Sequence, residues 1–149
     1  GSTQRACRCT PDQVARYQGK LSGPLLDRID LHVEVAHMPA EQLLTAHAGE
    51  ASAAIQARVT RARDTALTRQ GCSNQMLQGD AFDQHLQLND AAAQLLRKAA
   101  DRLGWSSRAT HRALRVARTI ADLADSPHVA STHVAEAMQY RRALLHSNA

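Results

Sequence analysis

The chain has 149 residues, of which 44% are hydrophobic and only 3% aromatic, so its core must consist of Ala, Leu, Val and Ile, which favours packed helices over a β-sandwich. No hydrophobic run approaches the roughly 20 residues that cross a bilayer, which argues against a membrane-spanning protein. Three cysteines do not make an even disulfide framework, which argues against a disulfide-rich secreted protein and predicts a cytoplasmic one. The formal net charge is +4, and nearly all of the positive charge is arginine, whose planar guanidinium matches phosphate oxygens.

The N-terminal part of the chain is expected to hold one short helix and one strand. Residues 3–21 are polar and irregular. A short helix should follow, because Pro24 suits a first helical turn and Ser22 or Gly23 can cap it. Residues 29–35 alternate between apolar and polar side chains, which predicts a half-buried strand. A lone strand cannot satisfy its own hydrogen bonds, so it either pairs with a copy of itself or, as we favour, belongs to a sheet whose other strands lie outside this chain.

The rest of the chain is expected to be helical, because apolar residues recur at intervals of three and four. The expected helices begin near Pro39, Ser52, Asp90, Ser106 or Ser107, and Ser131. Gly71 suits a left-handed cap at the end of the second helix, and Gly104 closes the third. Residues 71–89 should form a polar connector with one helical turn around Phe82 and Leu86. The positions expected to face inward are Ile55, Val59, Ala62, Ala66, Ala92, Leu95, Leu96, Ala99, Leu103, Ala113, Val116, Ala117, Ile120, Ala124, Val134, Ala137 and Met138.

No complete phosphate-binding loop is present in the sequence. The pair Gly19 and Lys20 resembles the end of one, but the pattern requires Ser or Thr after the lysine and Gly five residues before the pair. Leu21 and Val14 stand at those positions. No apolar strand ends in the paired acids that hold a phosphate-bound magnesium ion. This chain alone is therefore not expected to hydrolyse ATP.

A metal site within the chain is not expected either. Cys7 and Cys9 form one close pair, and His128 and His133 have a spacing that is common in zinc sites. A structural zinc ion needs four ligands that converge, and more than 100 residues separate the two pairs. Reduced surface thiols and ordinary helical histidines are the simpler interpretation.

Two sets of arginines could contact phosphate. Arg108, Arg112 and Arg115 are spaced i, i+4 and i+7 and share one stripe of a helix. Arg108 lies in the first turn, where main-chain N–H groups favour an anion. A solvated basic face explains this stripe about equally well. Arg28 is flanked by two aspartates, for which a local salt bridge is the simpler interpretation.

Several stretches match, in order and spacing, one family of ring-forming motors. They are SGPLLDRID at residues 22–30, SRA at 107–109, RVARTIADL at 115–123 and AEAMQYR at 135–141. Together they resemble the magnesium-chelatase-like AAA+ ATPases, and most of all the branch associated with bacterial competence. The implied fold is mainly α, a helical bundle preceded by one strand and a short helix. Residues 1–36, which begin with an apparent tag remnant at 1–2, would be the end of a truncated α/β ATPase core, and residues 37–149 a C-terminal helical lid.

The resemblance also implies roles for two of the arginines. Arg28 corresponds to the arginine finger, which reaches the γ-phosphate of ATP in a neighbouring subunit. Arg108 corresponds to the sensor-2 arginine, which contacts nucleotide from the lid, whereas Arg112 and Arg115 match less specific positions. ATP and Mg²⁺ would be bound by the full-length parent, whose Walker motifs lie upstream, and not by this chain alone. Cysteines upstream in the family could complete a metal site with the Cys-x-Cys segment.

The implied parent is a hexameric ring of identical subunits that acts as a DNA helicase, driving branch migration during natural transformation. Two alternatives stay open. A basic helical module that grips the DNA backbone would bind with an affinity that falls steeply with salt. The ATPase subunit of a magnesium chelatase would carry the same motor, and the physiology of the host would separate the two tasks.

Overall fold

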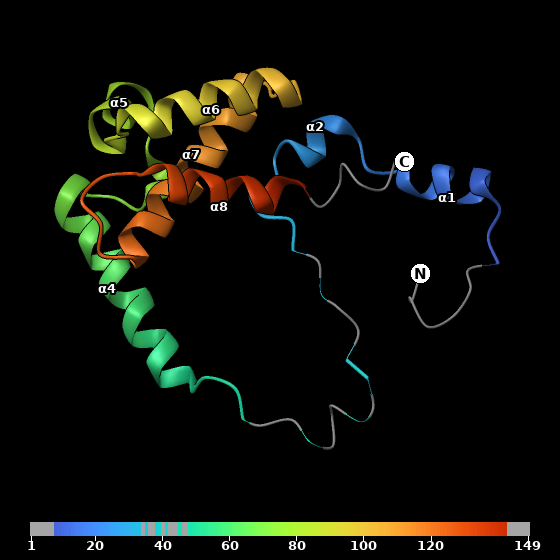
Figure 1. Ribbon diagram of the computed structural model, residues 1–149, viewed down its shortest axis with the longest axis horizontal. Coiled ribbons are helices and arrows are strands. Elements are labelled where there is room, and N and C mark those ends of the chain that lie inside the picture. Colours follow the sequence, from blue (N-terminus) through green and yellow to red (C-terminus); the bar gives the residue numbers. More distant parts are fainter. Residues whose placement is uncertain are drawn as a thin grey trace.

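In the computed structural model (Figure 1), the described residues are 8–33, 35, 38–39, 41, 45 and 48–142. The helices are α1 (Pro11–Gln18), α2 (Gly23–Leu26), α4 (Ser52–Gln70), the 3₁₀ helix η1 (Asn74–Met76), α5 (Gly79–Leu86), α6 (Asp90–Leu103), α7 (Ser107–Leu123) and α8 (Ser131–Arg142). Over these ranges the chain forms no strand, only one isolated parallel bridge between Leu88 and Val129. The mainly helical fold is confirmed. No helix in the described ranges has the length and apolar character needed to cross a membrane.

The central helix of the bundle is α7 (Figure 1). It packs against α8 and α4 and also contacts η1 and α5, while α6 packs on α8. Alanines at every fourth position, from Ala109 to Ala121, lie on its buried face. Because each side chain is a single methyl group, neighbouring helices can approach α7 closely. Larger core side chains around it are Leu77, Phe82, Leu86, Leu96, Leu114, Val129 and Val134.

The ends of the helices follow the capping residues of the sequence. The Ser106 hydroxyl accepts a hydrogen bond from the Ala109 N–H (3.1 Å) and caps α7, which confirms one of the two predicted caps. Gly71 and Gly104 follow α4 and α6 with φ of 73° and 61°. Glycine adopts this left-handed conformation without a Cβ clash, so both glycines end their helices as predicted.

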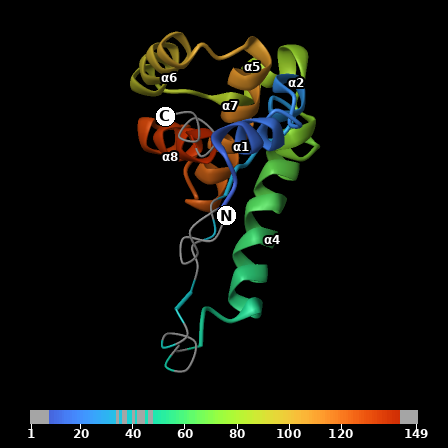
Figure 2. The same cartoon turned by 90° about the vertical axis from the view of Figure 1, so that its right-hand side faces the viewer.

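The first half of α4 extends beyond the bundle (Figure 2). Ile55 and Val59, which were predicted to face inward, are 39% and 51% exposed. Only Ala62 and Ala66, further along the same stripe, are buried. The prediction was wrong for the first two residues because periodicity identifies an apolar face but not how far neighbouring helices reach along it.

The connector between α4 and α6 is more ordered than its polar composition suggested. It contains η1 and α5, and Leu77, Phe82 and Leu86 enter the core from it. The helical turn expected around the last two is the complete helix α5. Tertiary burial of a few apolar side chains therefore orders a segment whose average composition is polar.

The N-terminal part differs from the prediction in two ways. Residues 11–18, expected to be irregular, form α1, which starts with a capping box: the Gln13 N–H donates to the Thr10 hydroxyl (3.3 Å) and the Thr10 N–H to the Gln13 amide oxygen (2.9 Å). The strand expected over residues 29–35 is not formed by residues 29–33 or 35. Instead the His32 N–H donates to the carbonyl of Tyr140 in α8 (2.7 Å). Alternation alone cannot make a strand, and the described residues supply no second strand to pair with this segment.

Two expectations fall partly on residues outside those described. The helix expected over residues 39–48 contains residues 40, 42–44 and 46–47, which are not among the described ones. The domain boundary between residues 36 and 37 also lies there, so it stays a prediction. By contrast, the short helix α2 is as expected, with Ser22 as its cap (the Leu25 N–H donates to the Ser22 hydroxyl, 3.3 Å).

Candidate functional site

The turn that follows α2 is docked on the first turns of α7. Ser106 donates its hydroxyl hydrogen to a carboxylate oxygen of Asp27 (3.2 Å). Arg112 donates to the main-chain carbonyl of Arg28 (2.8 Å) and forms an ion pair with Asp30. Between 79 and 84 residues separate the partners of these bonds in the sequence. The fold therefore brings the turn that carries Arg28 to the helix that carries the three-arginine stripe.

The last helix holds the same turn from a second side. Arg141 donates to the carbonyl of Ile29 (3.3 Å), and the neighbouring Tyr140 accepts the bond from the His32 N–H. The main chain of residues 27–32 is thus bonded to α7 at its start and to α8 at its end. Its position depends on the helical bundle.

The guanidinium of Arg28 is exposed and makes one hydrogen bond, to the carbonyl of Pro24 one turn back in α2 (2.9 Å). The two flanking aspartates bond to Ser106 and Arg112 in α7 instead. Among the described residues, no ion pair includes Arg28. The local salt bridge that the sequence favoured is therefore not formed, and no carboxylate in the described ranges pairs with this exposed cation.

The three arginines of the stripe on α7, Arg108, Arg112 and Arg115, have three different environments. Arg115 is half-buried, donates to the carbonyl of Leu77 (2.7 Å) and lies over the ring of Phe82, 5.7 Å from its centroid. Arg112 is bonded to the turn after α2. Arg108 is exposed, and no described residue bonds to its side chain. The stripe is thus neither a continuous phosphate-binding face nor a solvated one, since only its first member is free to meet a ligand.

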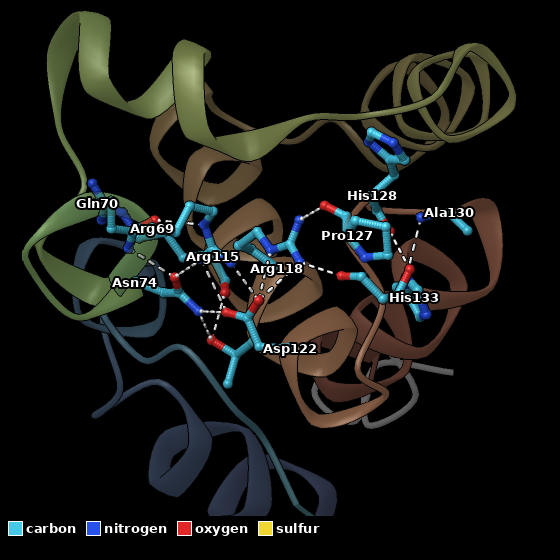
Figure 3. Close-up of polar contacts among 12 residues, drawn as sticks. Arg69, Gln70, Asn74, Arg115, Arg118, Asp122, Pro127, His128, Ala130 and His133 are labelled. Atoms are coloured by element: carbon cyan, nitrogen blue, oxygen red, sulfur yellow. Dashed lines mark hydrogen bonds and ion pairs between the residues drawn. The ribbon is translucent and has the colours of Figure 1, made fainter. Parts of the chain in front are cut away.

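A buried ionic network, which the sequence analysis did not identify, anchors the second half of α7 (Figure 3). The Asp122 carboxylate, 2% exposed, accepts hydrogen bonds from Arg118 (2.8 Å), Arg69 (3.0 Å) and Asn74 (2.8 Å). Arg118 is fully buried and also donates to main-chain carbonyls of the loop before α8, at Pro127 (2.8 Å) and Ser126 (2.6 Å). The four-residue spacing of Arg118 and Asp122, which suits an ion pair within one helix, was the signal in the sequence that could have revealed part of it.

The network also determines the charge state of its carboxylate. Burial alone would raise the pKa of Asp122, but the hydrogen bonds from Arg69 and Asn74 and the charges of Arg118 and Arg69 outweigh it and hold the pKa below its ordinary value. The ionised carboxylate therefore joins α4, η1 and α7 at one point, and Arg118 links it to the loop before α8.

A cavity of about 280 Å³ lies between the docked turn and the start of α7. His32, Trp105 and Arg141 are among the residues that line it. Both ring nitrogens of His32 are buried, and no described residue forms a hydrogen bond with either of them. This burial first, and the positive charge of Arg141 second, lower the pKa of His32. The imidazole is therefore held in its neutral form next to the docked turn.

Replacing His32 with leucine is expected to weaken the loss of stability that acidification causes. Because the pKa of His32 is lowered in the folded state, the unfolded chain binds this proton more readily, so the contribution is complete above the ordinary pKa of 6.5 and is lost as pH falls below it. Urea unfolding at about pH 7.5 and about pH 5.5 measures the difference. Substitution of the exposed His128 is the control and should leave the difference between the two pH values as it is in the wild type. An equal pH dependence in both variants would contradict the assignment to His32.

No group of three or more His, Cys, Asp or Glu side chains converges within the described part of the chain. Cys9 is exposed, and Cys7 lies outside the described residues. His133 accepts a hydrogen bond from the Ala130 N–H through its Nδ1 (3.1 Å), so this histidine bonds to the main chain just before α8.

Known proteins with similar sequences belong to the family that the motifs resemble. Residues 49–141 match the family model for the magnesium chelatase subunit ChlI, C-terminal part, and residues 1–43 match that for the magnesium chelatase subunit ChlI. The competence protein ComM of Haemophilus influenzae is 42% identical over 135 residues, which is 90% of this chain and 26% of ComM.

Two further relatives extend this comparison. YifB of Escherichia coli is 41% identical over 143 residues, 93% of this chain and 28% of YifB. The protein Rv2897c of Mycobacterium tuberculosis is 37% identical over 140 residues, 91% of this chain and 28% of the relative. The chain thus spans about a quarter of the length of its relatives. It belongs to the magnesium chelatase subunit ChlI family.

Proposed function

We propose that this chain is the helical lid, with the adjoining end of the ATPase core, of a ring-forming AAA+ ATPase. Arg28 is the arginine finger that reaches ATP in a neighbouring subunit, and Arg108 is the sensor-2 arginine. One observation carries the proposal: the turn of Arg28 is docked on the start of α7, which bears Arg108, and both guanidinium groups are exposed.

The chemistry of both groups fits a triphosphate. Arg108 lies in the first turn of the 17-residue helix α7, where unpaired main-chain N–H groups add to its positive charge. Arg28 is steadied by its bond to the carbonyl of Pro24 and can offer its remaining N–H groups to phosphate oxygens. Magnesium bound to ATP would offset charge on the transferred phosphoryl group. The described residues offer no carboxylate cluster for that ion, so it would be held by other parts of the parent protein.

The proposed parent is a hexamer of identical subunits in the cytoplasm that hydrolyses ATP to move DNA, as a helicase in branch migration during natural transformation. The name of the relative ComM, a competence protein, supports DNA as the substrate. So does the arginine-rich composition with a net charge of +4. In a magnesium chelatase the same two arginines would serve the same motor. ATP hydrolysis that rises on addition of DNA would favour the first task, and no response to DNA would favour the second.

Replacing Arg108 with alanine in the full-length parent should lower the turnover of ATP about 10-fold or more, because a charged donor to the phosphates is lost. Steady-state ATP hydrolysis and nucleotide affinity measure the effect. Arg61→Ala is the matched control, since Arg61 is also an exposed helical arginine but lies at the middle of α4, and no bond connects it to the docked turn among the described residues. Wild-type turnover in Arg108→Ala would refute the sensor-2 role.

A further inference from the structure

We infer that Arg112 is a positioning residue, which fixes the Arg28 turn on the start of α7 so that the finger is aimed correctly. The inference rests on the proposed role of Arg28. It concerns a residue whose place in the stripe of α7 suggests a second phosphate contact, whereas its bonds point to a different task.

Arg112 bonds to the main chain of Arg28, the proposed finger residue, and to a side chain of the same turn. Its Nη1 donates to the carbonyl oxygen of Arg28 (2.8 Å), and the same guanidinium pairs with the carboxylate of Asp30. A side chain that bonds to the carbonyl of Arg28 constrains the peptide from which the Arg28 side chain projects. The pair is only partly shielded, with exposed side-chain fractions of 24% for Arg112 and 46% for Asp30.

Ser106 provides a second attachment to α7 two residues before Arg108. Its oxygen accepts from the Ala109 N–H and its hydroxyl hydrogen goes to Asp27. One hydroxyl therefore caps the helix and holds the turn. Together, Ser106 and Arg112 with their two aspartate partners form what we call the clasp.

The magnitudes favour a positioning role over a structural one. An ion pair with a half-exposed carboxylate adds little to folding stability, because water screens the charges and two side chains lose freedom. A reacting group displaced by about 1 Å can, in contrast, slow a reaction about 100-fold. Loss of the Arg112 guanidinium should therefore affect turnover far more than folding.

The first test uses the full-length parent with Arg112→Met, which keeps an unbranched stem of similar length and removes the guanidinium. We expect kcat for ATP hydrolysis to fall about 10- to 100-fold with KM for ATP changed less than about 3-fold, since the finger does not belong to the subunit that binds the nucleotide. Arg97→Met is the matched control: Arg97 is exposed and bonds to the carbonyl of Ala93 one turn back (3.3 Å). An unchanged kcat in Arg112→Met would overturn the inference.

A double variant separates positioning from an independent contribution. If Arg112 acts through Arg28, adding Arg112→Met to Arg28→Ala should cause no further loss of turnover. If the two losses multiply, Arg112 acts by itself and the inference is wrong.

A third measurement on this chain alone does not depend on ATP hydrolysis. Amide hydrogen exchange followed by NMR should show faster exchange of the His32 N–H in Arg112→Met, by about 10-fold, with no change at Ala117 in the core. Faster exchange together with wild-type turnover in Arg28→Ala would keep the clasp but reject the proposed finger. Unchanged exchange and turnover in Arg112→Met, with turnover lost in Arg28→Ala, would reject the clasp and keep the finger.

Discussion

Replacing Asp122 with alanine is expected to lower the free energy of unfolding by about 3–5 kcal/mol, which is a large part of the stability of a domain of this size. The substitution leaves the fully buried Arg118 without the carboxylate that balances its charge, and it removes a partner from Arg69 and Asn74. Breaking one side of a buried pair is costly because the remaining charge cannot regain its hydration. Chemical denaturation of this chain monitored by circular dichroism measures the loss.

The exposed Asp101 of α6 offers the control, since Asp101→Ala should change stability by less than about 0.5 kcal/mol. The pH provides a second readout for Asp122. Because its folded pKa lies below the ordinary value of 3.8, its contribution is present above that pH and disappears as pH falls through the folded pKa. The difference between wild type and Asp122→Ala should therefore shrink in acid. A loss below about 1 kcal/mol at neutral pH would contradict the view that the network anchors α7.

The two ends of α7 are thus held by different means. The buried network fixes the second half, where Asp122 bonds to Arg69 of α4 and Arg118 bonds to the loop before α8. The clasp of Ser106, Arg112 and their aspartate partners acts at the first half, on the surface. Strong buried bonds suit a part of the bundle that stays fixed, and weaker exposed bonds suit a turn that, in the ring proposed above, would meet a neighbouring subunit and its nucleotide.

Local signals predicted the helices that local chemistry controls. Pro24 after Ser22 identified α2, and the glycines at 71 and 104 identified two helix ends, because each signal acts within a few residues. The capping box of Thr10 could have revealed α1 in the same way. The strand predicted from the alternation of residues 29–35 is not formed, because a strand needs a second strand to pair with and a local pattern cannot show whether one is available.

The candidate site was predictable in part. The motifs around Arg28 and Arg108 indicated both residues, and the structure places the turn of one beside the helix of the other. The partners of Arg112 and Arg115 could not be deduced, since both arginines bond to residues 38 or more positions away in the sequence. Such contacts depend on the packing of the whole bundle. A spacing rule shows which side chains share a face but not what lies opposite it.

Replacing Arg28 with alanine in the full-length parent is expected to reduce ATP turnover about 1,000-fold or more, because an arginine finger stabilises charge that develops on the transferred phosphoryl group. Folding should be unaffected, since the exposed guanidinium makes a single hydrogen bond within its own turn. Arg97→Ala is the control, because Arg97 is also exposed and also donates to a carbonyl four residues back. Turnover close to wild type in Arg28→Ala would remove the finger from the proposal.

Mixed rings test whether Arg28 acts across the subunit interface. A parent variant that cannot bind ATP is inactive alone but still presents Arg28 to its neighbour, whereas Arg28→Ala binds ATP but presents no finger. At an interface between one subunit of each kind, a bound nucleotide meets an intact finger, so mixtures should hydrolyse ATP although neither variant does so alone. Activity should peak near equal amounts, where such interfaces are most frequent. If the mixed rings contain both variants but do not hydrolyse ATP, Arg28 acts on the nucleotide of its own subunit. The docked turn would then face the nucleotide site of its own subunit and not that of the neighbour.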